Sequence, residues 1–211
     1  MTVLTKDHLP ERIVTERTIV RRAVPGDLPQ IAAWPEYPGH LAGFSMRRQE
    51  TPEPDGNLWW ERIDAPDRCH YSVVLPKSGE IIGVHAFVRI DWSKATIDNV
   101  GVRIRPDLCG QGYGSETLAP LLRAILESGI RSLRLDVAAT NQRAVRCYEK
   151  CGMWIADEFW REHKGEPIDL TDPKWIPLRK HLRFENDKCV IRFYWMEIRA
   201  TPVRADGTGG Y

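Results

Sequence analysis

The stretch that decides the fold of this chain is Val102-Arg103-Ile104-Arg105-Pro106-Asp107-Leu108-Cys109-Gly110-Gln111-Gly112-Tyr113-Gly114-Ser115. It begins as an alternating apolar strand, turns at Pro106-Asp107, and then carries glycine at every second position before a long apolar-periodic segment. Glycine lets the backbone turn sharply and lets a ligand approach it closely. The first amide groups of the following helix have no partner within that helix, and the helix dipole favours negative charge there. The stretch therefore predicts a site for a phosphate or pyrophosphate.

The spacing of these glycines excludes two common phosphate-binding loops. No Lys-Ser or Lys-Thr pair follows them, as a P-loop requires, and Gly-x-Gly-x-Gly is not the dinucleotide-binding fingerprint Gly-x-Gly-x-x-Gly. The missing lysine also counts against nucleotide-dependent phosphoryl transfer. On this motif alone, a glycine-rich turn that holds no ligand remains the alternative.

A second motif begins at Asn141, directly after a strand predicted within residues 133–137. It continues with Ala144, Tyr148 and Gly152, at the spacing Asn-x-x-Ala-x-x-x-Tyr-x-x-x-Gly. Together the two motifs resemble the GNAT superfamily of N-acetyltransferases. That family's glycine loop reads Arg/Gln-x-x-Gly-x-Gly/Ala after a Pro-acidic turn, and its second motif ends in Gly-Phe/Met. The resemblance extends over residues 18–199 and is sharpest over residues 100–153.

The composition of the 211 residues, with 42% hydrophobic and 28% charged side chains, is that of a soluble globular protein. A net charge of +1 argues against nucleic acid and acidic membrane surfaces as partners. No apolar run approaches the roughly 20 residues of a bilayer span, and the first residues lack the features of a signal peptide. Five cysteines without zinc spacing or a disulfide framework indicate a reduced cytoplasmic protein, with Cys147 and Cys151 as packed thiols.

We expect one domain over residues 18–200, preceded by an extension over residues 1–17 and followed by a tail over residues 201–211. The patterns predict an α/β fold of the α+β type, a mixed and mainly antiparallel twisted sheet of about seven strands with helices on both faces. The predicted strands are Thr18–Ala23, Tyr71–Leu75, Glu80–Arg89, Lys94–Arg105, Ser132–Val137, Met153–Trp160 and Val190–Arg199. The resemblance implies that the fourth and fifth strands run parallel and splay apart to admit the cofactor.

Helices are predicted for residues 28–34, residues 58–63, the segment after the glycines, and residues 141–151. The third has apolar residues at helical spacing, but Pro120 implies either a kink or a later start. Two segments without periodicity, residues 35–57 and 161–188, are expected to select the acceptor. Within the first, Arg47-Arg48 either attracts an acidic acceptor or is a solvated basic pair.

The resemblance implies acetyl-CoA as a co-substrate, and no metal. Backbone N–H groups of the glycine loop can surround the pyrophosphate, while the splayed fourth strand offers backbone groups to the pantetheine arm. The backbone N–H of Ile104 is also a candidate donor to the developing oxyanion. The cofactor-binding residues that follow from the resemblance are Val102, Ile104, Cys109, Gly110, Gln111, Gly112, Tyr113, Gly114, Ser115, Asn141 and Ala144.

The family motif assigns Tyr148 the role of general acid toward the departing CoA thiolate. A phenol, with an ordinary pKa of about 10, can reprotonate a thiolate whose thiol has a pKa of about 8.5. The alternative is a core aromatic, because Tyr148 shares an apolar face with Ala144 and Cys151. As general base we expect Asp98 on the fourth strand. By hairpin pairing His85 is the second candidate, although a lone strand histidine is usually structural.

The sequence departs from the family at Cys109, where the pattern has Arg or Gln. The change removes a cationic or amide side chain from the loop but leaves the backbone cradle, so we expect cofactor binding to survive. Arg103 or Arg105 is then expected to supply positive charge. A cysteine beside a helix N-terminus is also expected to have a lowered pKa.

These observations predict an acetyl-CoA-dependent N-acetyltransferase. It would move an acetyl group to a primary amine of a small molecule or of a peptide N-terminus, by direct attack on the thioester. Within the superfamily the chain resembles the subgroup that contains ribosomal-protein N-terminal acetyltransferases. The alternative is an acyl-CoA-binding sensor or scaffold that does not turn over. The apolar last strand serves either a homodimer or the monomer's own core, and the identity of the amine stays open.

Overall fold

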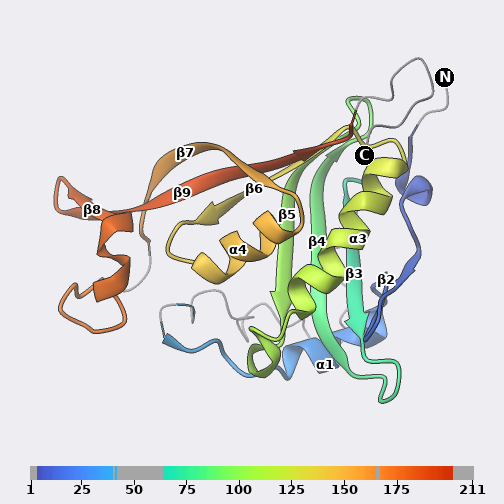
Figure 1. Ribbon diagram of the computed structural model, residues 1–211, viewed down its shortest axis with the longest axis horizontal. Helices are drawn as coiled ribbons and strands as arrows, with labels where there is room; N and C mark the ends of the chain where they lie inside the picture. Colours follow the sequence, from blue (N-terminus) through green and yellow to red (C-terminus); the bar gives the residue numbers. More distant parts are fainter. Residues whose placement is uncertain (1–3, 40, 42–63, 165–166, 202–211) are drawn as a thin grey trace.

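The computed structural model of the protein describes residues 4–39, 41, 64–164 and 167–201. The strands in these ranges are β1 (Arg12–Val14), β2 (Ile19–Arg22), β3 (Arg68–Val74), β4 (Ile81–Asp91), β5 (Thr96–Ile104), β6 (Ser132–Ala138), β7 (Trp154–Glu162), β8 (Leu182–Glu185) and β9 (Lys188–Arg199). The α-helices in these ranges are α1 (Leu28–Ala32), α3 (Tyr113–Glu127) and α4 (Gln142–Lys150). The strands form one sheet in the order β1-β2-β3-β4-β5-β6-β9-β7, with β8 paired to β9 (Figure 1).

The strand pairing confirms a mixed, mainly antiparallel sheet. The predicted hairpin is β3 and β4, which run antiparallel in the register Arg68↔Val88. In the described sheet, β5 and β6 are the parallel neighbours, and they pair only at Thr96↔Ser132 and Ile97↔Leu133. Beyond these two pairs the strands separate, as the resemblance implied. The sheet therefore opens where β5 leads into the glycine loop.

Alternation along β4 divides the sheet into two faces. His85 and Phe87 are fully buried on the face that α3 covers, and Figure 1 shows α3 lying across β3–β5. Val84 and Ala86, which point the other way, face a cavity that Ile31 of α1 also lines. Helices thus pack on both faces of the sheet, in agreement with the prediction.

The helix α3 is held by one apolar stripe. Its residues Leu118, Leu121, Leu122 and Ile125 have no exposed surface. Burying each such side chain contributes about 1.5–3 kcal/mol, so the stripe anchors the helix firmly on the sheet. Pro120 lies inside this helix, which begins at Tyr113, so the regular part does not start later. The glycine loop is therefore followed at once by a firmly anchored helix.

Two strands were not predicted from the sequence. β1 belongs to the expected extension, yet it pairs antiparallel with β2. β8 lies in the polar segment after β7, preceded by the 3₁₀ turn Ile176–His181, and it pairs with β9. Both strands are three or four residues long, too short for alternation to show in the sequence.

Several other expectations can be compared with the described residues. No helix within them is long and apolar enough to cross a membrane. All five cysteines are free thiols, and Cys151 is buried while Cys147 is partly buried, as packed thiols should be. The helix predicted for residues 58–63, and Arg47-Arg48, lie outside the described residues.

Candidate active site

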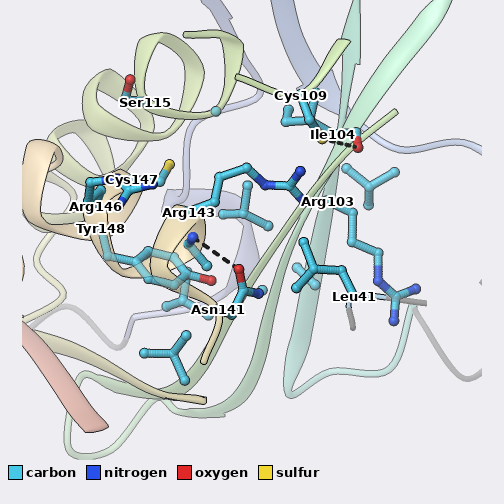
Figure 2. Close-up of a pocket in the computed structure, with 18 of the residues that line it drawn as sticks. Leu41, Arg103, Ile104, Cys109, Ser115, Asn141, Arg143, Arg146, Cys147 and Tyr148 are labelled. Atoms are coloured by element: carbon cyan, nitrogen blue, oxygen red, sulfur yellow. Dashed lines mark hydrogen bonds between the residues drawn. The ribbon is translucent and has the colours of Figure 1, made fainter. Parts of the chain in front are cut away.

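A cavity of about 840 Å³ occupies the opening between β5 and β6 (Figure 2). The glycine loop, the first turn of α3, the inner side of α4 and the end of β5 surround it. Of the predicted cofactor-binding residues and the predicted general acid, all but Gln111 line it: Val102, Ile104, Cys109, Gly110, Gly112, Tyr113, Gly114, Ser115, Asn141, Ala144 and Tyr148. The two motifs, about 30 residues apart in the chain, thus meet in one site.

The glycine loop has the backbone conformation that its sequence predicts. Gly110 and Gly112 have φ angles of +83° and +87°, a region that residues with a Cβ adopt only with strain. Gly112 is the N-cap of α3, and the first helical bond runs from Glu116 N–H to its carbonyl over 3.0 Å. The amide groups that precede Glu116 therefore have no partner within the helix and are available to an anion.

Gly114 is required for a different reason. A Cβ at this position would lie 3.0 Å from Sγ of Cys147, a residue of α4. The contact is tighter than nearly all Cβ contacts in proteins, so the Cys147 side chain would have to shift by a few tenths of an ångström. Glycine therefore lets the start of α3 approach α4 across the top of the cavity.

The end of β5 turns backbone groups toward the cavity. Arg105 N–H donates to the Ile82 carbonyl over 2.8 Å, so the next pair, Gly83↔Ile104, is one whose backbone groups point outward. Val102, two residues earlier, has the same orientation. The Ile104 carbonyl accepts a hydrogen bond of 2.6 Å from the Tyr37 hydroxyl, whose pKa burial raises to about 12. Val102 and Ile104 thus lie where the prediction placed them.

Tyr148 projects from α4 into the same opening. Its side chain is only 6% exposed, and the nearby backbone of Val102 lowers its pKa by less than burial raises it. Burial raises the pKa of Tyr148, so the phenol keeps its proton. Asn141 caps α4 by accepting a hydrogen bond of 3.2 Å from Ala144 N–H, the dashed line at Asn141 in Figure 2. The cap fixes the start of the helix that carries the phenol.

Cys109 does not behave as expected. Its thiol turns back toward the Ile104 carbonyl at 3.4 Å, and burial raises its pKa, whereas we expected a lowered one. Arg143 of α4 also brings positive charge to this part of the cavity. Figure 2 shows this side chain extending across the cavity toward Cys109, whose pKa it draws partly back down. Arg143 also stacks over the Tyr37 ring at 5.3 Å, which holds its guanidinium in place.

Of the two arginines expected to supply charge, Arg103 lines the cavity. Arg105 instead pairs with Asp107 at 2.8 Å and with Glu80 at 3.4 Å. Because these two carboxylates already pair with its guanidinium, Arg105 does not supply positive charge to the cavity.

Comparison with known proteins agrees with this geometry. The model of the acetyltransferase (GNAT) family matches residues 32–153, more than half of the chain. This chain belongs to the GNAT acetyltransferase family.

Two curated relatives of this GNAT chain are similar in sequence. Thialysine N-epsilon-acetyltransferase of Sus scrofa is 28% identical over 91 residues, which are 40% of this chain and 54% of that protein. Mycothiol acetyltransferase of Streptomyces coelicolor is 27% identical over 154 residues, which are 71% of this chain and 47% of that protein. The chain spans about half the length of the curated relatives that it matches.

Solved GNAT structures show the same fold. A chimera of the spermidine N-acetyltransferase SpeG of Vibrio cholerae and hSSAT superimposes with a TM-score of 0.63 at 17% identity, over 88% of this chain and 96% of the other. A GNAT-family acetyltransferase from Bacillus anthracis superimposes with a TM-score of 0.60 at 16% identity, over 90% of this chain and 98% of the other. At such identities the likeness concerns the fold alone.

The two candidate bases, which were chosen by their places on the predicted strands, lie elsewhere in this GNAT chain. The Asp98 carboxylate accepts a hydrogen bond of 3.0 Å from Nε of Arg134, and its neighbour Asn99 lines the cavity instead. His85 is buried under α3, with Nε2 2.8 Å from the Thr117 hydroxyl, and burial lowers its pKa to about 3. Neither residue reaches the cavity, so the structure does not support either as the base.

Gln111 is the predicted cofactor-binding residue that does not line the cavity. Its side chain donates to the Asp107 carbonyl over 3.2 Å, and its own carbonyl accepts from Arg17. The residue braces the loop from outside the cavity. Its expected role in cofactor binding stays a prediction for its backbone N–H alone.

Several residues that line the cavity of this GNAT chain were not singled out from the sequence. Asp136 of β6 forms an ion pair of 2.9 Å with Arg161 of β7, whose guanidinium lies 4.2 Å from the Phe193 ring centre. His70 and Tyr37 also line the cavity. The sequence did contain a signal for Asp136, because a carboxylate inside the apolar strand Ser132–Ala138 needs a partner or a function.

Proposed function

We propose that this chain is an acetyl-CoA-dependent N-acetyltransferase that acetylates a primary amine of a small molecule or of a peptide N-terminus. One observation carries the proposal most directly. The glycine loop, the outward-facing backbone groups of β5 and the buried phenol of Tyr148 all open into a single cavity. Each supplies one requirement of acetyl transfer, respectively an anion site, donors for an extended arm, and a proton.

The residues present fit a CoA thioester, which the GNAT family implies as co-substrate. The unpaired amides of Gly112–Ser115 would hold the pyrophosphate at the positive end of α3. Arg143 would add the positive charge that the family pattern places at position 109. The outward backbone groups of Val102 and Ile104 would bind the amides of the pantetheine arm. The thioester supplies the activated acetyl group.

The chain's own groups account for the proton transfers. The neutral amine attacks the thioester carbonyl, and the C–S bond breaks as the departing sulfur takes the proton of the Tyr148 hydroxyl, which burial keeps protonated. The nitrogen loses one proton as it becomes the amide, and this proton restores the Tyr148 hydroxyl. An alkylammonium has a pKa of about 10.4 and must first lose a proton. Asp136 and His70 are the carboxylate and imidazole among the described residues that line the cavity, so we assign proton removal to one of them.

The names of the relatives support a class of acceptor but do not identify the acceptor itself. Their names refer to thialysine, mycothiol and spermidine, which supports a small amine over a protein surface. The described residues that line the cavity offer a cationic acceptor little free negative charge. Asp136 is the one carboxylate among the described residues that line it, and Arg161 already neutralises that carboxylate.

The test is acetyl-CoA turnover with a panel of amines, measured as free thiol released. The panel contains amino acids, short peptides with free N-termini, aminoglycosides and polyamines. We expect release with one class, weakest for polyamines. Tight acetyl-CoA binding without release by any amine would favour the sensor or scaffold, and neither binding nor release would overturn the proposal.

A further inference from the structure

The turn between β1 and β2 lies against the glycine loop. Nη2 of Arg17 donates to the Gln111 carbonyl over 3.1 Å. A Cβ on Gly112 would lie 3.5 Å from the same nitrogen. The guanidinium also lies 4.0 Å from the ring centre of Tyr113. One side chain, more than 90 residues distant in sequence, therefore contacts three consecutive residues of the loop.

The same turn binds a carboxylate in the first turn of α3. Oε1 of Glu116 accepts hydrogen bonds from the Thr15 hydroxyl at 2.7 Å and from Arg17 N–H at 3.1 Å. Oε2 accepts from Nε of Arg17 at 2.6 Å. Burial alone would raise the pKa of Glu116, but these hydrogen bonds outweigh it and lower that pKa. Glu116 is therefore ionised and fully paired.

An ionised carboxylate at this position needs such a partner if the loop is to hold a phosphate. Glu116 lies one turn from the amides that would bind the anion, and like charges at that separation repel. Arg17 cancels the charge of Glu116 and joins it to the loop backbone. Arg17 binds Glu116 through Nε and the Gln111 carbonyl through Nη2. It is not among the described residues that line the cavity.

We propose that Arg17 is a positioning residue for the cofactor, which holds the loop Gln111–Tyr113 in its anion-binding form and neutralises Glu116 beside it. The inference rests on the proposed function, because it takes this loop to be the pyrophosphate site. It assigns a role to a segment that the sequence placed in a terminal extension.

The test compares two acetyl donors in wild type and Arg17→Ala. Acetyl-CoA carries the pyrophosphate, and S-acetylpantetheine lacks it. We expect the KM for acetyl-CoA to rise about tenfold in Arg17→Ala, a value reduced for the partial exposure of Arg17. We expect kcat, and the KM for S-acetylpantetheine, to stay within about twofold. Arg12→Ala, an exposed arginine of β1, is the matched control and should leave both KM values unchanged.

Calorimetric binding of CoA separates this inference from the proposed function, because it needs no turnover. Weaker CoA binding by Arg17→Ala, with wild-type binding by Arg12→Ala, supports the inference even if no acceptor is found. Unchanged CoA binding by Arg17→Ala overturns the inference and leaves the acetyltransferase proposal standing. Wild type that does not bind CoA overturns both.

Two further variants distinguish positioning from a simple effect of charge. Arg17→Lys keeps the charge but cannot join Glu116, the Gln111 carbonyl and the Tyr113 ring, so it should bind CoA as weakly as Arg17→Ala. Restored affinity in Arg17→Lys would show that charge alone matters. Thr15→Val removes one bond to Glu116 without changing any charge, and should weaken CoA binding by about threefold. Thermal unfolding of every variant identifies any that fails to fold.

Discussion

Replacing Tyr148 with phenylalanine removes one hydroxyl from the centre of the proposed site. The phenol is buried on α4 and, like Val102 of β5, lines the cavity. If it protonates the departing thiolate, Tyr148→Phe should lower kcat by about 10²–10⁴-fold, the usual effect of losing a general acid. That loss corresponds to about 3–5 kcal/mol of the activation free energy. The KM for acetyl-CoA should change little, since the pyrophosphate site is untouched.

The same substitution has a separate cost in stability. Removing this buried hydroxyl is expected to cost about 0.5–1.5 kcal/mol of the free energy of unfolding. Tyr71→Phe is the matched control, because Tyr71 is fully buried and its hydroxyl donates to the Pro10 carbonyl over 2.7 Å, away from the cavity. It should lose comparable stability and keep wild-type kcat.

The assay is steady-state thiol release with a responsive amine, at a temperature where denaturant titration shows both variants folded. A large fall in kcat for Tyr148→Phe alone supports the acid role. Wild-type kcat in Tyr148→Phe would refute it and leave Tyr148 a packed aromatic. Equal losses in both variants would assign the effect to stability.

Three further predictions follow from single positions. Gly112→Ala, at a φ of +87°, should lose about 1–2 kcal/mol of unfolding free energy and bind CoA more weakly, whereas Gly26→Ala, with no atom within 4 Å, should do neither; denaturant titration and calorimetry decide. Arg143→Ala should raise the KM for acetyl-CoA about tenfold with kcat unchanged, and an unchanged KM would contradict its role. His85 remains neutral in the fold because burial lowers its pKa from 6.5 to about 3, so below pH 6.5 only the unfolded chain takes up its proton. Stability should therefore fall by about 1.4 kcal/mol per pH unit from this group on acidification, and equal acid slopes for wild type and His85→Gln would contradict this.

The parts of the fold with strong local signals could be predicted. β5, the glycine loop and α3 follow one another in a single stretch, where alternation, glycine spacing and helical periodicity each mark one element. Asn141 and Gly152 mark the ends of α4 by capping chemistry, which is local as well. By contrast, β1 and β8 form because they pair with β2 and β9, and three or four residues are too few for an alternating pattern to show in the sequence.

The site could be predicted only where its residues belong to a motif. Alternation along β5 says that Asp98 and Asn99 face opposite sides, but not which side opens into the cavity. The ion pair of Asp98 with Arg134 depends on where β6 lies beside it. Arg17 and Arg143 could not be assigned for the same reason, since their partners come from distant parts of the chain. Sequence motifs therefore located the site, while tertiary packing decided which charges surround it.

Amide hydrogen exchange with and without CoA locates the bound cofactor without requiring an acceptor. It therefore tests whether the glycine loop is the pyrophosphate site. We expect CoA to slow exchange of the amides of residues 109–116 and of the end of β5, and to leave exchange in the β8–β9 hairpin unchanged. CoA binding that leaves residues 109–116 unprotected, or protects another surface instead, would contradict the assignment of this loop as the pyrophosphate site.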